Sequence, residues 1–486
     1  MKKQLGIVLL LLLVMGSNIG SAGGAATTAA PTNLTGNVAQ WLPASARENL
    51  QLFALSESLQ LRNGVEAIGA PTAEPTAEPT AEATAQPAQT PPTPAQLENF
   101  YEHIWQLVGA TYYNPAALTH WGDWEHKFDG KLKTVEDLEA ALQQMVASIG
   151  DHWTSYTPYA ERVKNYNQFK ANVVDLGMML KLENDAYRVW YVEWGSVAWA
   201  ADIRRGDIIT AIAGTQITNK TSQDQVDALL MQAQGTKVTI VDQHGSTTEK
   251  IELTAAAAAT PEVESHLDSH GIAYIRFPNF DDPNLLDDFV KQLKDMYDAS
   301  APKHFSALVI DLRGNPGGLG SEAISFVSAF MQKGIVMSQL TRQGRLLTTS
   351  QLSVVAPDVA GGQPSEFAKF VERVPLYLLV DENSASAAEV TAGGFKDNHR
   401  AILIGNTTWG KGVGYVDYDQ QSGPYATLPT GGLLQITVEG LRTPNGSNVQ
   451  GRGIRPNIFI YQPRGHKGDI QLQNSLRYVA AAMAGH

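Results

Sequence analysis

The chain has 486 residues, of which 36 are Lys or Arg and 49 are Asp or Glu, giving a net charge of −13. This length suggests two to four domains, and the absence of a basic stripe argues against a nucleic-acid partner. There is no cysteine, so a disulfide framework, a thiol nucleophile and a zinc–thiolate site are excluded.

The first residues are organised like a secretory signal. Lys2 and Lys3 precede an apolar run over 5–15, and small residues follow at 20–22. This order is typical of a signal peptide over residues 1–22, and the run is short for a bilayer span. We expect export to the periplasm, cell envelope or extracellular space, with no membrane span after signal removal. An uncleaved anchor is the alternative.

A proline-rich stretch over residues 71–96 divides the chain. The tetrapeptide PTAE repeats from Pro71, and the following residues offer little apolar surface to bury. Repeated proline fixes φ and removes amide donors, which predicts a semi-extended linker. Residues 23–70, before the linker, have no assigned role.

Three regions with different periodicity follow. Residues 97–168 contain amphipathic patterns over 97–107 and 134–149 and are predicted to form an N-terminal helical domain. Residues 169–256 carry short β-runs broken by glycine, which predicts a small β-rich domain with one helix over 222–234. In residues 257–486 strand and helix patterns alternate, as in an α/β layer fold. The clearest apolar strands there are 306–312, 374–380 and 400–404.

The first of these strands runs into a glycine-rich turn, Arg313–Gly318. Several glycines where a strand meets a helix bring backbone amides close to a phosphate or a developing oxyanion. The spacing matches neither GxGxxG nor a P-loop. A tight structural turn is the other interpretation.

The second strand leads into two serines, Ser384 and Ser386, at the start of a helical pattern. A serine here is ordinarily an N-cap, but with two of them one can cap while the other acts as a nucleophile. The positive helix end and the next amide favour an oxyanion. No GxSxG elbow is present, so a Ser-His-Asp mechanism on the α/β-hydrolase fold is not indicated.

The third strand precedes Lys411, which lies between two glycines and beside Trp409. A lysine that acts as a base must be neutral near the working pH, so burial has to lower its pKa from about 10.4 by roughly 3 units. A dyad of serine and lysine then needs no histidine.

Together these motifs resemble the carboxyl-terminal processing peptidases, or tail-specific proteases. The resemblance covers roughly residues 98–462, and the motifs appear in family order: Gly150–Tyr156, Asp311–Gly318, Ser384–Glu389, Trp409–Gly412 and Thr443–Asn457. It implies an α/β fold with a crotonase- or Clp-protease-like core, an N-terminal helical region and an inserted PDZ-like β-rich domain.

The resemblance also implies roles for individual residues. Ser386 matches the family nucleophile and Lys411 its general base, and the oxyanion donors would be the amides of Ala387 and of Gly317 or Gly318.

One position departs from the family pattern. Where the family has a glutamine that orients the lysine, this chain has Tyr415. A phenol can accept a hydrogen bond from lysine, so the Tyr415 hydroxyl is expected to take over that role.

The β-rich domain fits the same family. Leu176-Gly177-Met178 resembles the PDZ loop whose amides capture a peptide's C-terminal carboxylate while the peptide adds to a sheet edge. The apolar pocket would be lined by Met178, Leu180, Val226 and Leu230. The alternative is a domain that only packs against the core.

We therefore expect an exported serine endopeptidase that cuts protein substrates near their C-termini. The main alternative is a catalytically degenerate peptide-binding or scaffold protein, supported by Tyr415. A crotonase-type acyl-CoA enzyme is a second alternative, against which the PDZ-like domain argues. No metal or organic cofactor is implied, the expected partners are proteins or peptides, and the motifs specify neither the natural substrate nor the oligomeric state.

Overall fold

The computed structural model describes residues 92–162, 173–244, 246–258, 261–343, 346–354, 365–418, 431–463 and 469–484. The predicted signal peptide, residues 23–70 and most of the predicted linker lie outside these ranges. Within them, no helix is both long and apolar enough to cross a membrane.

The N-terminal region is helical, as expected. Its two α-helices are α4 (Pro94–Thr111) and α5 (Val135–Ala147), joined by short 3-10 turns. Helix α4 begins inside the predicted linker, because Thr93 and Gln96 form a capping box and Pro94 fits the first helical position. The apolar faces of both helices are buried in one core cluster, which also contains Tyr156, Leu434 and Ile436.

The β-rich region forms a sheet in the order β3-β4-β5-β8-β9, with β6 also paired to β5, and a separate two-stranded sheet of β2 and β7. The bounds are β2 (Val173–Asp175), β3 (Met178–Glu183), β4 (Ala186–Val192), α7 (Val197–Ala200), β5 (Ile208–Ile212), β6 (Thr215–Gln216), α8 (Gln223–Leu230), β7 (Met231–Ala233), β8 (Lys237–His244) and β9 (Thr247–Thr254). The helix expected over 222–234 ends at Leu230, because β7 turns away and pairs with β2.

The core is a six-stranded sheet in the order β10-β11-β12-β15-β16-β19, parallel except for β10. Its strands are β10 (Glu264–Leu267), β11 (Ile272–Arg276), β12 (Ala307–Asp311), β15 (Leu376–Val380), β16 (Ala401–Gly405) and β19 (Ile458–Phe459). Its helices are α9 (Pro283–Ala299), α10 (Gly320–Ser328), α11 (Glu366–Arg373), α12 (Ala387–Asp397) and α13 (Ile470–Ala484). Helices α9, α10 and α12 pack on one face and α13 on the other, which explains the continuous apolar strands.

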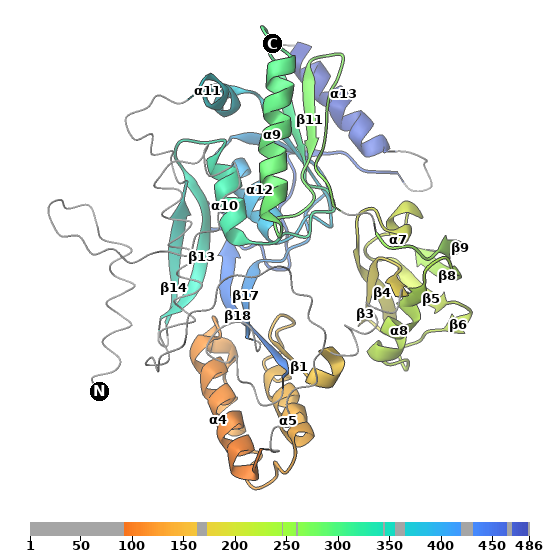
Figure 1. The fold of residues 1–486 in the computed structure, drawn as a ribbon, viewed down its shortest axis with the longest axis vertical. Helices are drawn as coiled ribbons and strands as arrows, with labels where there is room; N and C mark the ends of the chain where they lie inside the picture. The colour runs from red at the N-terminus through yellow and green to blue at the C-terminus, as the bar shows by residue number, and fades with distance from the viewer. Residues whose placement is uncertain are drawn as a thin grey trace, which may run out of the picture.

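A second sheet joins the core to the helical region. It runs in the order β1-β18-β13-β14, with β17 also paired to β18. The bounds are β1 (Ser155–Thr157), β13 (Ile335–Gln343), β14 (Leu346–Ser353), β17 (Val413–Tyr418) and β18 (Leu433–Arg442). Figure 1 shows β18 running from the core towards the helical region, with the β-rich domain beside the core.

The expected fold class is confirmed. Strands β12, β15 and β16 are parallel neighbours, so the three loops singled out in the sequence leave the sheet at the same edge. The site is built on that edge.

Candidate active site

Ser386 is the residue immediately before α12 and has φ 53° and ψ −116°. This is a left-handed backbone conformation that costs a non-glycine residue energy and that often marks a functional position. Its neighbours Ala385 and Ala387 are buried, whereas Ser386 is partly exposed. The strained turn therefore presents the Ser386 side chain at the surface of the site.

The other serine, Ser384, is fully buried. Its hydroxyl donates to the carbonyl of Leu312 at 2.7 Å and accepts from the amide of Asp381 at 2.9 Å. Ser384 thus joins two of the loops and has no exposed oxygen for chemistry.

The glycine-rich turn lies directly against Ser386. Gly317 has φ 104°, and a Cβ on it would lie 2.6 Å from the Ser386 Cβ, so only glycine permits this approach. The Gly317 amide donates to the Asn315 side chain at 2.9 Å. Among the described residues, the amides of Gly318 and Ala387 donate to no acceptor.

A buried ion-pair network holds this turn in place. Arg313 bonds to Asp311 at 2.6 Å and to Asp469, just before α13, at 2.7 Å. The two carboxylates overcome the effect of burial and raise the pKa of Arg313. No sequence motif indicates a role for Asp469, because its partner Arg313 lies far away along the chain.

Glu389 joins the nucleophile loop to the lysine loop. One of its oxygens accepts from the amides of Ser386 (3.0 Å) and Lys411 (2.8 Å). The other oxygen accepts from the amide of Gly410 at 2.7 Å and from the hydroxyl of Thr408. Burial raises the pKa of Glu389, and these four hydrogen bonds oppose the rise. The sequence motif contained Glu389, but no local signal indicated this role.

The amine of Lys411 is half-buried, and this lowers its pKa from the usual lysine value. Three carboxylates oppose the effect of burial, those of Asp281, Glu389 and Asp417. Its Nζ lies 4.3 Å from the centre of the Trp153 ring and 4.7 Å from that of Tyr415. Because aromatic faces favour a charged amine, the two rings stabilise the protonated state.

Tyr415 contacts Lys411 with its ring face, and its hydroxyl bonds to the side chain of Gln435. The contact observed with Lys411 is that of the ring, and the expected role of the hydroxyl stays a prediction. The Tyr415 ring stacks on Trp153 at 6.1 Å with 9° between the planes, and this stacking turns its face to the amine.

Trp153 comes from the helical region and was missed in the sequence. It is held by its neighbours Asp151 and Thr154, which bond to each other at 2.8 Å and to Thr437 on β18. This anchoring fixes the ring beside Lys411.

The β-rich domain also reaches the lysine loop. Arg205 donates to the carbonyl of Trp409 at 3.1 Å, and its guanidinium lies 4.0 Å from the centre of the Trp409 ring. Trp190 on β4 packs edge-to-face on the same ring at 4.6 Å. The domain is therefore in direct contact with the residue before Gly410 and Lys411.

The predicted peptide-binding residues lie together in this domain. Leu176 and Met178 lead into the edge strand β3, while Leu230 ends α8. All three side chains are buried, as are Leu180 and Val226. The expected apolar pocket is thus a packed cluster between β3 and α8.

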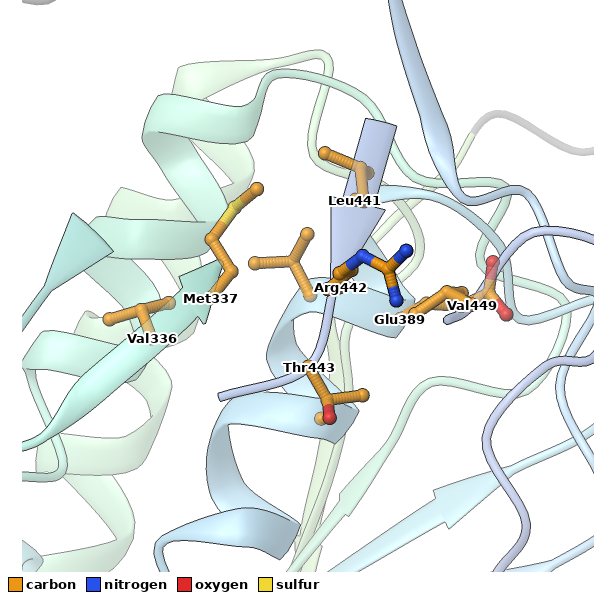
Figure 2. Close-up of a pocket in the computed structure, with 9 residues that line it drawn as sticks. Val336, Met337, Glu389, Leu441, Arg442, Thr443 and Val449 are labelled. Carbon is orange, nitrogen blue, oxygen red and sulfur yellow. The ribbon is translucent and has the colours of Figure 1, made fainter. Parts of the chain in front are cut away.

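A small cavity lies behind Glu389, with a volume of about 10 Å³. Figure 2 shows its lining, which includes Met337 from β13, Glu389 from α12 and Thr443 after β18. This is room for about one water, so this cavity is too small to hold a peptide.

Comparison with known proteins agrees with this architecture. Residues 271–460 match peptidase family S41, and residues 188–241 match the PDZ domain. The core of the chain is therefore a peptidase family S41 domain, and the β-rich region is a PDZ domain.

Two curated relatives are similar over most of this chain. The "Probable CtpA-like serine protease" of Staphylococcus aureus is 29% identical over 369 residues, which are 75% of this chain and 65% of the relative. The "Carboxy-terminal-processing protease" of Bartonella bacilliformis is 28% identical over 355 residues, covering 71% of this chain and 75% of the relative. The match thus spans just under two thirds of the length of the staphylococcal relative.

The fold also resembles that of a solved structure, the photosystem II D1 C-terminal processing protease. The TM-score is 0.58 at 20% identity, covering 75% of this chain and 93% of the other. At this identity the likeness concerns the fold.

Proposed function

We propose that the protein is a serine endopeptidase with Ser386 as nucleophile and Lys411 as general base. The observation that carries the proposal is the single Glu389 oxygen that accepts from the amides of both residues. One buried carboxylate thus fixes the two loops relative to each other, as a two-residue catalytic unit requires.

In the proposed reaction, neutral Lys411 takes the proton from the Ser386 hydroxyl while the oxygen attacks a peptide carbonyl. The amides of Gly318 and Ala387 stabilise the negative charge that develops on the carbonyl oxygen. Protonated Lys411 then gives the proton to the leaving amine, and water hydrolyses the acyl-enzyme. The lowered pKa of Lys411 supports its part in these steps.

The substrate and location are part of the same proposal. Relatives named for carboxy-terminal processing support cleavage near protein C-termini, with the PDZ domain as the peptide-binding module. The pattern of residues 1–22 supports export. The alternative, a catalytically degenerate scaffold suggested by Tyr415, predicts that Ser386 is not labelled by an active-site probe.

The test is labelling with a fluorophosphonate probe, combined with casein digestion. The native chain should be labelled and active, and both Ser386→Ala and Lys411→Ala should lose activity with unchanged melting temperatures. Because the two residues act as one unit, the double variant should be no worse than either single variant. Digestion by pure Ser386→Ala protein would overturn the assignment.

A further inference from the structure

The amides of the PDZ carboxylate loop already have acceptors within the chain. Leu176 donates to the carbonyl of Leu230 at 3.2 Å, and Gly177 donates to the carboxylate of Asp175 at 2.6 Å. The Met178 amide also bonds to the Asp175 carboxylate. The loop amides therefore already bind a carboxylate of the chain itself, that of Asp175.

The backbone holds Asp175 in this position from both sides. Asp175 ends β2 and pairs with Met231 of β7. Gly177 follows with φ 79°, and a Cβ there would lie 2.0 Å from the Ser196 Cβ. The turn is thus packed against Ser196, and the position of β2 places the Asp175 carboxylate beside the loop amides.

The charges around the loop disfavour a second carboxylate. Asp227 on α8 and Glu193 after β4 both lie within electrostatic range of Asp175. Like charges brought together in a partly desolvated site repel one another. A peptide's terminal carboxylate would have to displace Asp175 and remain beside these groups.

The hydrogen-bonding edge of β3, which follows the loop, carries a weaker contact than the loop amides do. Strand β3 is at the edge of its sheet, and the Gln223 side chain from α8 donates to the Leu180 carbonyl at 2.8 Å. A peptide backbone can displace the Gln223 side chain from this carbonyl, so a peptide can still add to β3 as a further strand.

We propose that Asp175 takes the place of a ligand carboxylate and makes this PDZ domain select extended internal segments over free C-termini. This inference rests on the proposed role of the domain as the peptide-binding module. The PDZ domain would then bind a substrate at a segment upstream of the substrate's C-terminus, and this segment would be distinct from the cleavage site.

The experiment is calorimetry on the full chain carrying Ser386→Ala, with one apolar-ended peptide in its acid and amidated forms. The acid should bind no more tightly than the amide. In an added Asp175→Ala variant, the acid should gain about tenfold or more, while the amide changes by less than about twofold. Asp175→Asn removes the charge but keeps an acceptor for Gly177, so its gain should be smaller.

Gln223→Ala is the matched control, because it frees the strand edge without changing charge and should affect both peptides equally. A native preference for the acid of about tenfold, or an acid-to-amide ratio unchanged by Asp175→Ala, would overturn the inference. Failure of every variant to bind either peptide would overturn the peptide-binding role with it. The Ser386 labelling result is independent of all these outcomes.

Discussion

The chain contains two glycine-containing turns whose backbone amides lie close together. The two turns differ in whether those amides already have a hydrogen-bond acceptor. Beside Ser386, the amides of Gly318 and Ala387 have no acceptor among the described residues. In the PDZ loop, the amides of Gly177 and Met178 both bond to Asp175. Amides without an acceptor can stabilise a negative charge that appears only during a reaction. Amides that already bond to a carboxylate of the chain disfavour a ligand that brings a second carboxylate.

The largest effect is expected from adding one methyl group to each turn. Gly317→Ala would place a Cβ 2.6 Å from that of Ser386 and should lower kcat/KM about a hundredfold or more, with loss of labelling. Gly177→Ala, whose Cβ meets Ser196, should weaken peptide binding and leave Ser386 labelling intact. Equal loss of labelling in both variants would show that the two turns are not independent.

A smaller loss is expected from changing the carboxylate that joins the two catalytic loops. In Glu389→Gln, one oxygen becomes an NH₂ group that cannot accept from the amides, so kcat should fall about ten- to a hundredfold. Glu366→Gln, on the exposed face of α11, is the control and should be neutral. Wild-type kcat in Glu389→Gln would mean that the loops are held by other contacts.

The pH profile tests the aromatic contacts of Lys411. Only the neutral amine accepts a proton, so kcat/KM should rise with pH through the pKa of Lys411, which burial lowers. Trp153→Leu removes a face that stabilises the charged amine by about 0.7 kcal/mol, so the rise should move to lower pH by about 0.5 units. Trp153→Phe keeps a ring and should move it less.

Tyr415→Phe also keeps the ring and should hold kcat within about twofold of the native value. If the hydroxyl instead orients Lys411, as the sequence suggested, Tyr415→Phe should lower kcat about ten- to a hundredfold while Tyr415→Gln preserves it.

A further effect concerns the contact between the PDZ domain and the lysine loop. Arg205→Ala removes a hydrogen bond and a ring contact at Trp409 and should lower kcat by about three- to tenfold. Arg188→Ala is the control, because among the described residues the Arg188 side chain donates to Gly206 of its own domain. A peptide ligand that stimulates the native chain should stimulate Arg205→Ala less.

Much of the fold was predictable because its signals are local. The helical patterns over 97–107 and 134–149 and the apolar strands of the core follow from periodicity and are observed. The end of α8 was not predictable, since it depends on β7 pairing with β2, a contact between segments far apart in sequence.

The same distinction holds at the site. Ser386 and Lys411 were identified from motifs, and the structure brings their backbones to one carboxylate. Trp153 lies within the recognised motif Gly150–Tyr156, but its contact with Lys411 crosses from one domain to another and has no local signal. Asp469 contacts Arg313 from far along the chain, so no local pattern could indicate it. Asp175 lies next to a recognised motif, but its occupancy of the loop depends on side-chain direction, which sequence does not specify.

The link between Arg313 and Asp469 has a consequence for the timing of activity during synthesis. Arg313 and Asp469 are 156 positions apart in the sequence, so in a growing chain Arg313 lacks this partner until residue 469 has been made. Strand β18 likewise closes onto β1 late. A growing chain that already carries Ser386 and Lys411 therefore lacks the Asp469 contact of its glycine turn, and we expect proteolytic activity to begin only after residue 469 has been made.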